Sequence, residues 1–107
     1  MAKKADVKLV EKKINLFKSK LKQEGLEGAK FILFGSWAKG KQGENSDIDL
    51  CVVSDSFSGN SFQDSTFLRL MTIGIDEMLE PVAMRPEDLE DKYNTLAMEI
   101  KKYGVAV

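Results

Sequence analysis

Two aspartates and a glycine–serine pair are the residues of this chain whose types and spacing could do chemistry. They lie in the stretch FGSWAKGKQGENSDIDL, residues 34–50. Residues i and i+2 of a strand project to the same face, roughly 6.6 Å apart along the chain. Asp47 and Asp49 therefore share one face, opposite the face of Ile48. Such a D-x-D pair is either a solvated sheet face or a ligand set for a divalent cation such as Mg²⁺, which prefers hard oxygen ligands.

Gly35 and Ser36 could supply the second half of such a site. A glycine at the end of a buried strand lets the backbone approach a ligand closely. A serine just after it can cap a short helix, whose first amides bind anions. The alternative is an ordinary strand-to-helix turn. The pattern is not the P-loop G-x-x-x-x-G-K-[ST], so a triphosphate bound here would rest in a different cradle and share its oxygens with metal ions on Asp47 and Asp49.

The composition excludes several classes of enzyme and indicates the cellular compartment of the protein. The 107 residues contain no histidine, which excludes Ser-His-Asp, Cys-His and zincin chemistry. The single cysteine, Cys51, cannot form an internal disulfide and fits a reducing cytoplasm. Its flanks predict a buried small hydrophobe. We expect a cytoplasmic protein of one domain, residues 1–107, because neither a secretory leader nor an apolar run of about 18 residues is present.

Charge is unevenly distributed along the chain. Residues 1–30 hold nine lysines and four acidic residues, a net charge of +5, which leaves −6 for the rest of a chain with a net charge of −1. A basic N-terminal helix could contact RNA or an acidic partner, or could simply present a solvated lysine face. Direct nucleic-acid binding is not indicated, because no basic stretch is interleaved with aromatic residues.

The hydrophobic pattern predicts the elements that must position these residues. A helix over residues 4–24, which ends before Gly25, is predicted by apolar residues at three- and four-residue steps: Val7, Val10, Ile14, Phe17 and Leu21. AKFILFG and SDIDLCVVS read as strands, with a turn and one helical turn between them. A second helix is expected over residues 62–79, a third strand at EPVAMRP, and a final helix beginning at Pro86. The order α-β-β-α-β-α indicates an α/β fold in which a small mixed β-sheet packs with helices.

On these residues the chain resembles the DNA-polymerase-beta-like nucleotidyltransferase superfamily. Its signature is G-S, ten residues, then D-x-D, as in GSWAKGKQGENSDID. The order of elements is most similar to the minimal single-domain members, the MNT proteins. The resemblance implies that Gly35 and Ser36 contact nucleotide phosphates, and that Asp47 and Asp49 hold two Mg²⁺ ions. It also implies ATP or another NTP as the substrate.

Two further residues are assigned by the resemblance, each with a departure from the family pattern. The third metal-binding carboxylate would be Glu80, where members often have aspartate; Asp76 and Glu77 are competing candidates. Pro81, which follows Glu80, confines that strand to an edge or an end of the sheet. Lys39 stands where the family often has arginine. Lysine keeps the charge for a phosphate contact but loses the bidentate geometry.

The implied reaction is a two-metal transfer. Two Mg²⁺ ions about 3.5–4 Å apart would clamp an in-line displacement at the α-phosphorus. One ion, on Asp47, Asp49 and Glu80, would activate an acceptor hydroxyl, and the other would stabilise the leaving pyrophosphate. No histidine is needed for this chemistry.

The resemblance also suggests which kind of acceptor receives the nucleotide. Minimal members are typically paired with a HEPN-domain protein, so the resemblance suggests an antitoxin that transfers AMP to a hydroxyl of its toxin partner. One alternative is a non-catalytic nucleotide-binding module that neutralises its partner by masking it. Another is a small-molecule nucleotidyltransferase completed by a homo- or hetero-oligomer. The intact Gly-Ser and D-x-D residues favour activity over masking.

Overall fold

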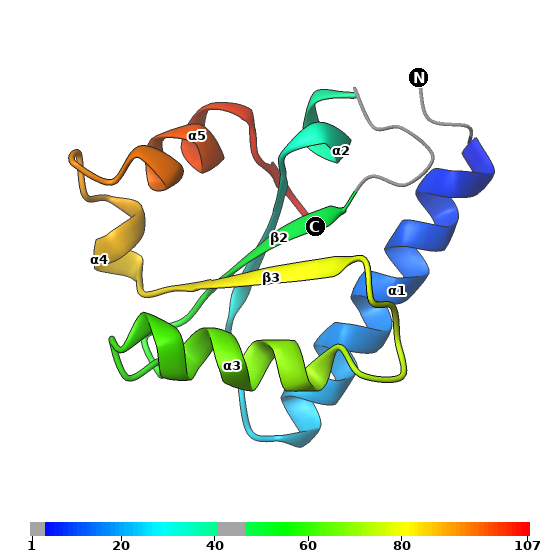
Figure 1. The fold of residues 1–107 in the computed structure, drawn as a ribbon, viewed down its shortest axis with the longest axis horizontal. Coiled ribbons are helices and arrows are strands. Elements are labelled where there is room, and N and C mark those ends of the chain that lie inside the picture. Colours follow the sequence, from blue (N-terminus) through cyan, green and yellow to red (C-terminus); the bar gives the residue numbers. More distant parts are fainter. Residues whose placement is uncertain (1–3, 41–46) are drawn as a thin grey trace.

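The computed structural model describes residues 4–40 and 47–107, with side chains from residue 8 onward. Its elements, in chain order, are α1 (Lys4–Gln23), β1 (Lys30–Phe34), α2 (Ser36–Lys39), β2 (Ile48–Val53), α3 (Ser61–Met71), β3 (Leu79–Met84), α4 (Pro86–Leu89), α5 (Thr95–Tyr103) and β4 (Val105–Ala106). The expected α/β fold is confirmed (Figure 1). No helix within the described residues is long and apolar enough to cross a membrane.

The sheet is mixed, as predicted, with the strand order β3-β2-β1-β4. β1 runs antiparallel to β2 and β4, whereas β2 and β3 are parallel. A parallel pair needs a crossover, and here the crossover contains α3. β3 is an edge strand, which accommodates Pro81 because a proline has no N–H to donate to a further strand. The expectation that Pro81 marks an edge is therefore confirmed.

Side chains of the sheet alternate between two hydrophobic cores. One core lies between the sheet and the helices α1 and α3, and it receives Ile48, Leu50 and Val52 of β2. The other lies beneath α5 and receives Cys51 and Val53. Figure 1 shows α1 and α3 on one side of the strands, with α4 and α5 on the other. The face of β2 that carries Asp49 is thus covered by a helix along part of its length.

The predicted first helix is confirmed within one residue. Val10, Ile14, Phe17 and Leu21 lie on its buried face, and none is more than 6% exposed. Fully burying one such side chain contributes about 1.5–3 kcal/mol, so this stripe holds α1 on the sheet. The side chain of Val7, predicted to belong to the same stripe, lies outside the described residues, as do Lys41 and the rest of residues 41–46.

Two predicted helices were too long. The second ends at Met71, not near residue 79, and Gly74 in the following turn has φ 84°. The helix that begins at Pro86 ends at Leu89 and is followed by a separate helix, α5. Side chains interrupt it: Asp91 accepts from the backbone N–H of Tyr93, and Asn94 accepts from Ala97 and caps α5. Such local side-chain hydrogen bonds compete with a continuous helix. The sequence analysis also missed β4.

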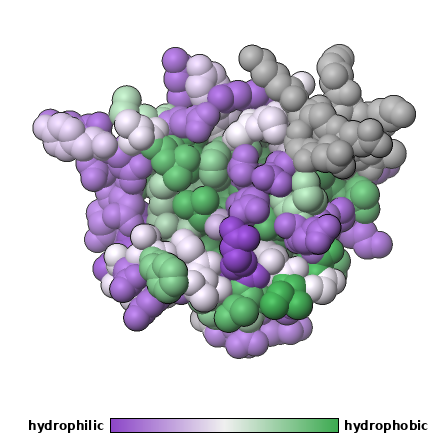
Figure 2. All heavy atoms as spheres, viewed as in Figure 1, coloured by the Kyte–Doolittle hydropathy of each residue, from purple (hydrophilic) through white to green (hydrophobic). Residues whose placement is uncertain are grey.

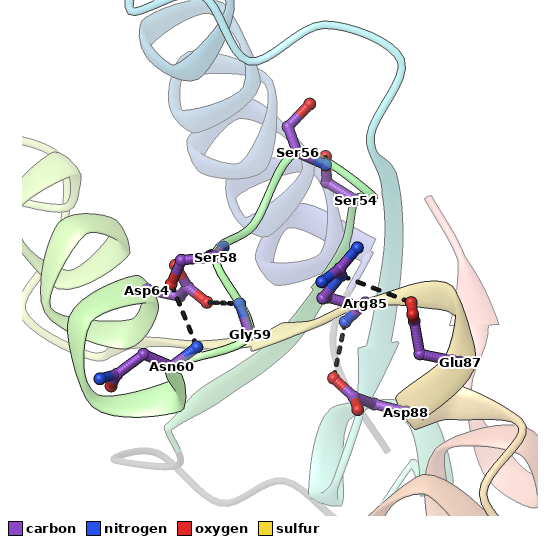
Figure 3. A network of polar contacts seen from close by, with 9 residues as sticks. All are labelled: Ser54, Ser56, Ser58, Gly59, Asn60, Asp64, Arg85, Glu87 and Asp88. Atoms are coloured by element: carbon purple, nitrogen blue, oxygen red, sulfur yellow. Dashed lines mark hydrogen bonds and ion pairs between the residues drawn. The ribbon is translucent and has the colours of Figure 1, made fainter.

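A polar network closes the end of the β2–β3 pair that lies away from Asp49 (Figure 3). The Asp64 carboxylate accepts hydrogen bonds from Ser58 and from the backbone of Gly59. Arg85 forms an ion pair with Glu87, and its backbone N–H donates to Asp88. These contacts fix the serine-rich loop and the start of α4, so this end of the sheet is structural.

Gly104 fixes the path from α5 into β4. A Cβ atom there would overlap the carbonyl oxygen of Ile100 and lie 2.5 Å from Cγ2 of Ile32. We predict that Gly104→Ala lowers the free energy of unfolding by about 1–3 kcal/mol through overpacking, as measured by urea denaturation. Its φ of −67° is ordinary, so backbone strain would contribute nothing to that loss. A loss below about 0.5 kcal/mol would show that the turn opens freely.

Candidate active site

Asp49 and Glu80 lie side by side on neighbouring strands. In the parallel pair β2–β3, Asp49 is in register with Glu80, and on the other side Asp49 is opposite Phe34 of β1. Neighbouring strands are about 4.8 Å apart, so residues in register on one face are adjacent. Asp47 precedes β2 and is exposed. Two of the three predicted carboxylates are therefore brought together by strand pairing.

Gly35 leaves room for the carboxylate of Asp49. Its backbone has φ 72° and ψ −150°, a region that L side chains rarely adopt. A Cβ atom on Gly35 would overlap Oδ2 of Asp49 and lie 3.0 Å from its Cγ. A glycine is therefore favoured at position 35 for two reasons: the backbone conformation there and the close approach of the Asp49 carboxylate.

The predicted cap of the short helix was wrong. Gly35 occupies the N-cap position of α2, and Ser36 is the first helical residue, with no side-chain cap hydrogen bond. The single helical turn itself was predicted correctly. Ser36 therefore does not cap the helix, and its hydroxyl is a candidate for binding a ligand.

An open cleft of about 570 Å³ collects most of the predicted residues. Its lining residues are Phe34, Gly35, Ser36, Lys39, Asp49, Glu80, Val82, Leu96 and Glu99. Small-molecule sites commonly have this size. Five of the six predicted site residues share the cleft, and Asp47 is not among its lining residues.

Negative charge dominates around Asp49. Burial raises the pKa of the Asp49 carboxyl above its ordinary value, and repulsion by Asp47, Glu80 and Glu99 raises it further. Among the described residues, no salt bridge neutralises Asp49. A site that holds several anions together is suited to a cation.

The third predicted carboxylate has a partner of its own. Glu80 accepts a hydrogen bond from the Arg69 guanidinium, with 2.7 Å between Nη2 and Oε2. Arg69 comes from α3, on the opposite side of the sheet, and it reaches Glu80 beside the edge strand β3. Within residues 4–40 and 47–107, no group of three or more potential ligands is gathered as a metal site. The expected three-carboxylate set is not assembled in this arrangement.

Lys39 also has partners that the sequence analysis missed. Its Nζ lies 2.8 Å from Oε1 of Glu99 and 4.7 Å from the ring centre of Tyr103, both on α5. Glu99 and Arg69 are thus additional residues of this region. No local motif indicates either of them, because their contacts join residues 60 and 11 positions apart.

The competing candidates lie elsewhere. Asp76 pairs with Lys13 of α1 and accepts from the backbone N–H of Met78, and these hydrogen bonds lower the pKa of its carboxyl. Glu77 is exposed and does not line the cleft. Cys51 is fully buried, and burial raises the pKa of its thiol to about 12. It is the inert core residue that the sequence predicted, not a nucleophile.

Comparison with known proteins identifies the family. A family model described as a nucleotidyltransferase domain matches residues 14–104. The chain therefore belongs to the nucleotidyltransferase domain family, and its mixed sheet has the polymerase-beta-like fold. A crystal structure of a toxin–antitoxin with AMP-PNP is similar in fold, with a TM-score of 0.51 and 20% identity, covering 84% of this chain and 68% of that one. A comparison with curated proteins finds no match.

Alanine at position 35 should disturb both the turn and Asp49. We expect Gly35→Ala to cost about 1–3 kcal/mol of stability from the backbone conformation, with an added cost from displacing the carboxylate. In the Asp49→Ala background the overlap is gone, so the same substitution should cost less. Urea denaturation of the four variants measures the difference. Equal losses in both backgrounds would show that the carboxylate moves away freely.

Asparagine at position 49 should stabilise the protein when divalent cations are chelated. The folded-state pKa of Asp49 is raised, so ionisation is less favourable in the folded than in the unfolded chain. This destabilisation is absent well below the unfolded pKa of about 3.9 and complete above the folded pKa. Asp49→Asn should therefore melt at a higher temperature than the wild type at pH 7 but not at pH 3. An equal gain at both pH values would rule out charge repulsion as its cause.

Proposed function

We propose that this domain transfers a nucleoside monophosphate, AMP from ATP in the first instance, to a hydroxyl group of a partner protein. The observation that carries the proposal is the register of Asp49 with Glu80, beside a glycine whose missing side chain makes room for the Asp49 carboxylate. Membership of the nucleotidyltransferase domain family supports the reaction class. The resemblance to MNT proteins supports AMP and a protein acceptor.

The cleft favours nucleotide binding only together with divalent cations. Among the residues that the structure describes, Asp49, Glu80 and Glu99 line it against one lysine, Lys39. A bare triphosphate would be repelled by this excess of carboxylates. The oxygen donors of Asp47 and Asp49 have the chemistry that Mg²⁺ prefers. Burial, and then repulsion by neighbouring carboxylates, raises the pKa of Asp49, so a cation beside it would be favourable. Bound Mg²⁺ would supply that charge and polarise the phosphate oxygens.

The roles of the side chains follow from their positions. Gly35 lets the phosphates approach the backbone, and Ser36 and Lys39 contact phosphate oxygens. Asp47 and Asp49 would hold the magnesium ions. Glu80 would join as the third ligand on exchanging Arg69 for a metal ion. The Arg69–Glu80 pair is partly exposed, and surface pairs contribute only about 0–1 kcal/mol, so this exchange is inexpensive.

A protein acceptor is supported by the surroundings of the cleft. The structurally similar toxin–antitoxin was crystallised with AMP-PNP, and we assign this chain a corresponding antitoxin role with a HEPN-type toxin. α3, whose Arg69 touches the cleft residue Glu80, exposes Phe62 by 80% and Leu70 by 53%, and the turn that follows it exposes Ile73 by 66%. Figure 2 shows hydrophobic side chains among hydrophilic ones over this part of the surface. Exposed apolar surface of this kind is typical of protein–protein contact.

Two alternatives would use the same fold differently. A non-catalytic module could bind a nucleotide and mask its partner without transfer. A small-molecule nucleotidyltransferase could complete its acceptor site through an oligomer. Shared placement of Gly35, Ser36, Lys39, Asp49 and Glu80 in one cleft favours a working transferase over masking.

The test combines nucleotide binding with transfer. At a hundredfold excess over Kd, ATP with Mg²⁺ should stabilise the fold by about 2–3 kcal/mol, and the double variant Asp47→Asn/Asp49→Asn should lose that gain while remaining folded. Radiolabelled α-phosphate should move from ATP to a protein in a cell extract or to a purified HEPN partner. Thermal melts and autoradiography measure the two effects.

Glu77→Gln is the matched control, because Glu77 is an exposed carboxylate near Glu80 that does not line the cleft. It should leave binding and transfer unchanged. Stabilisation that persists in the double variant would place the metal elsewhere. Stabilisation without transfer to any protein would favour masking, and label on a small molecule would favour the second alternative.

A further inference from the structure

α5 holds Lys39 by two contacts that come from one helical face. Glu99 accepts a hydrogen bond from the ammonium at 2.8 Å, and the ring of Tyr103 lies 4.7 Å from the same nitrogen. Residues four apart on a helix lie on the same side, so the carboxylate and the ring act together. A lysine side chain has about 2 kcal/mol of rotamer entropy. The two contacts restrict that freedom.

The pair lies in the cleft, not on a remote surface. Lys39 and Glu99 line it together with Asp49 and Glu80. α5 has another ion pair of equal length, between Lys101 and Glu90, which does not line this cleft. Comparing the two pairs therefore distinguishes the effect of an ion pair on the stability of α5 from its effect on the cleft.

Lys39 can keep Glu99 and still bind a phosphate. A lysine ammonium has three N–H donors. Glu99 takes one of them, which leaves two for phosphate oxygens. Glu99 can therefore orient the ammonium and still leave two N–H donors for phosphate.

We propose that Glu99 is a positioning residue of the transfer site, which holds the Lys39 ammonium in the cleft where a nucleotide phosphate binds. The inference rests on the proposed function and adds α5 to the elements that build the phosphate site. Glu99 acts through Lys39, since its own negative charge would repel the phosphate. Its net contribution to nucleotide affinity is favourable only while Lys39 is present.

A double-mutant cycle tests this dependence. The affinity for ATP with Mg²⁺ is measured by calorimetry for the wild type, Glu99→Gln, Lys39→Met and the double variant. Glu99→Gln should weaken binding about twofold to fivefold when Lys39 is present. In the Lys39→Met background it should cause no weakening, because the residue that it positions is gone. Equal weakening in both backgrounds, or none in the presence of Lys39, would overturn the proposal.

Two controls separate this outcome from failure of the proposed function or of the fold. Glu90→Gln breaks the other ion pair of α5 and should leave affinity unchanged; a matching loss would mean that α5 itself had been disturbed and would overturn a specific role for Glu99. The fluorescence of Trp37, the single tryptophan, reports the position of α2 and should be the same in Glu99→Gln. Failure of the wild type to bind any nucleotide with Mg²⁺ would instead refute the proposed function, and the inference with it.

Discussion

The parallel pairing of β2 with β3 is the constraint on which the site depends. Side chains alternate along both strands, so the burial of Leu50 and Leu79 on the α1–α3 face fixes which way Asp49 and Glu80 point. A slip of one residue would turn every side chain of one strand to the opposite face, which would bury a carboxylate and expose leucine. The free energy of the larger hydrophobic core therefore sets the register of the carboxylates as well as the fold.

The site itself departs from what stability would favour. Gly35 takes a positive φ, and burial together with neighbouring carboxylates raises the pKa of the Asp49 carboxyl. Both features oppose folding in the absence of a ligand. They persist because the strands that carry them are fixed by apolar packing on both sides of the sheet. Strain and like charge concentrated at one end of a well-packed sheet are typical of a binding site.

Local pattern was sufficient for most elements of the fold and for the residues of β1, α2 and β2 that line the cleft. The stripe on α1, the strands that carry FILF and DID, and the G-S turn are all set by residues close together in the sequence. The ends of α3 and the break between α4 and α5 depend on side-chain hydrogen bonds from residues such as Asp91 and Asn94, which periodicity does not register. Arg69 and Glu99 could not be found, because only the folded chain brings them to Glu80 and Lys39.

Two charged residues of the cleft, Glu80 and Lys39, each form an ion pair with a residue of another element. α3 supplies Arg69 to Glu80, and α5 supplies Glu99 to Lys39, whereas Asp49 has no salt-bridge partner among the described residues. The Arg69–Glu80 pair is partly exposed and therefore weak, so a cation could displace Arg69 at small cost. The Lys39 ammonium can keep Glu99, because it has two further N–H donors for another partner. The uncompensated carboxylate is the one that strand register places beside Gly35. On the proposed function, a cation would therefore bind first at Asp49, between a pair that it can displace and a lysine that Glu99 holds in place.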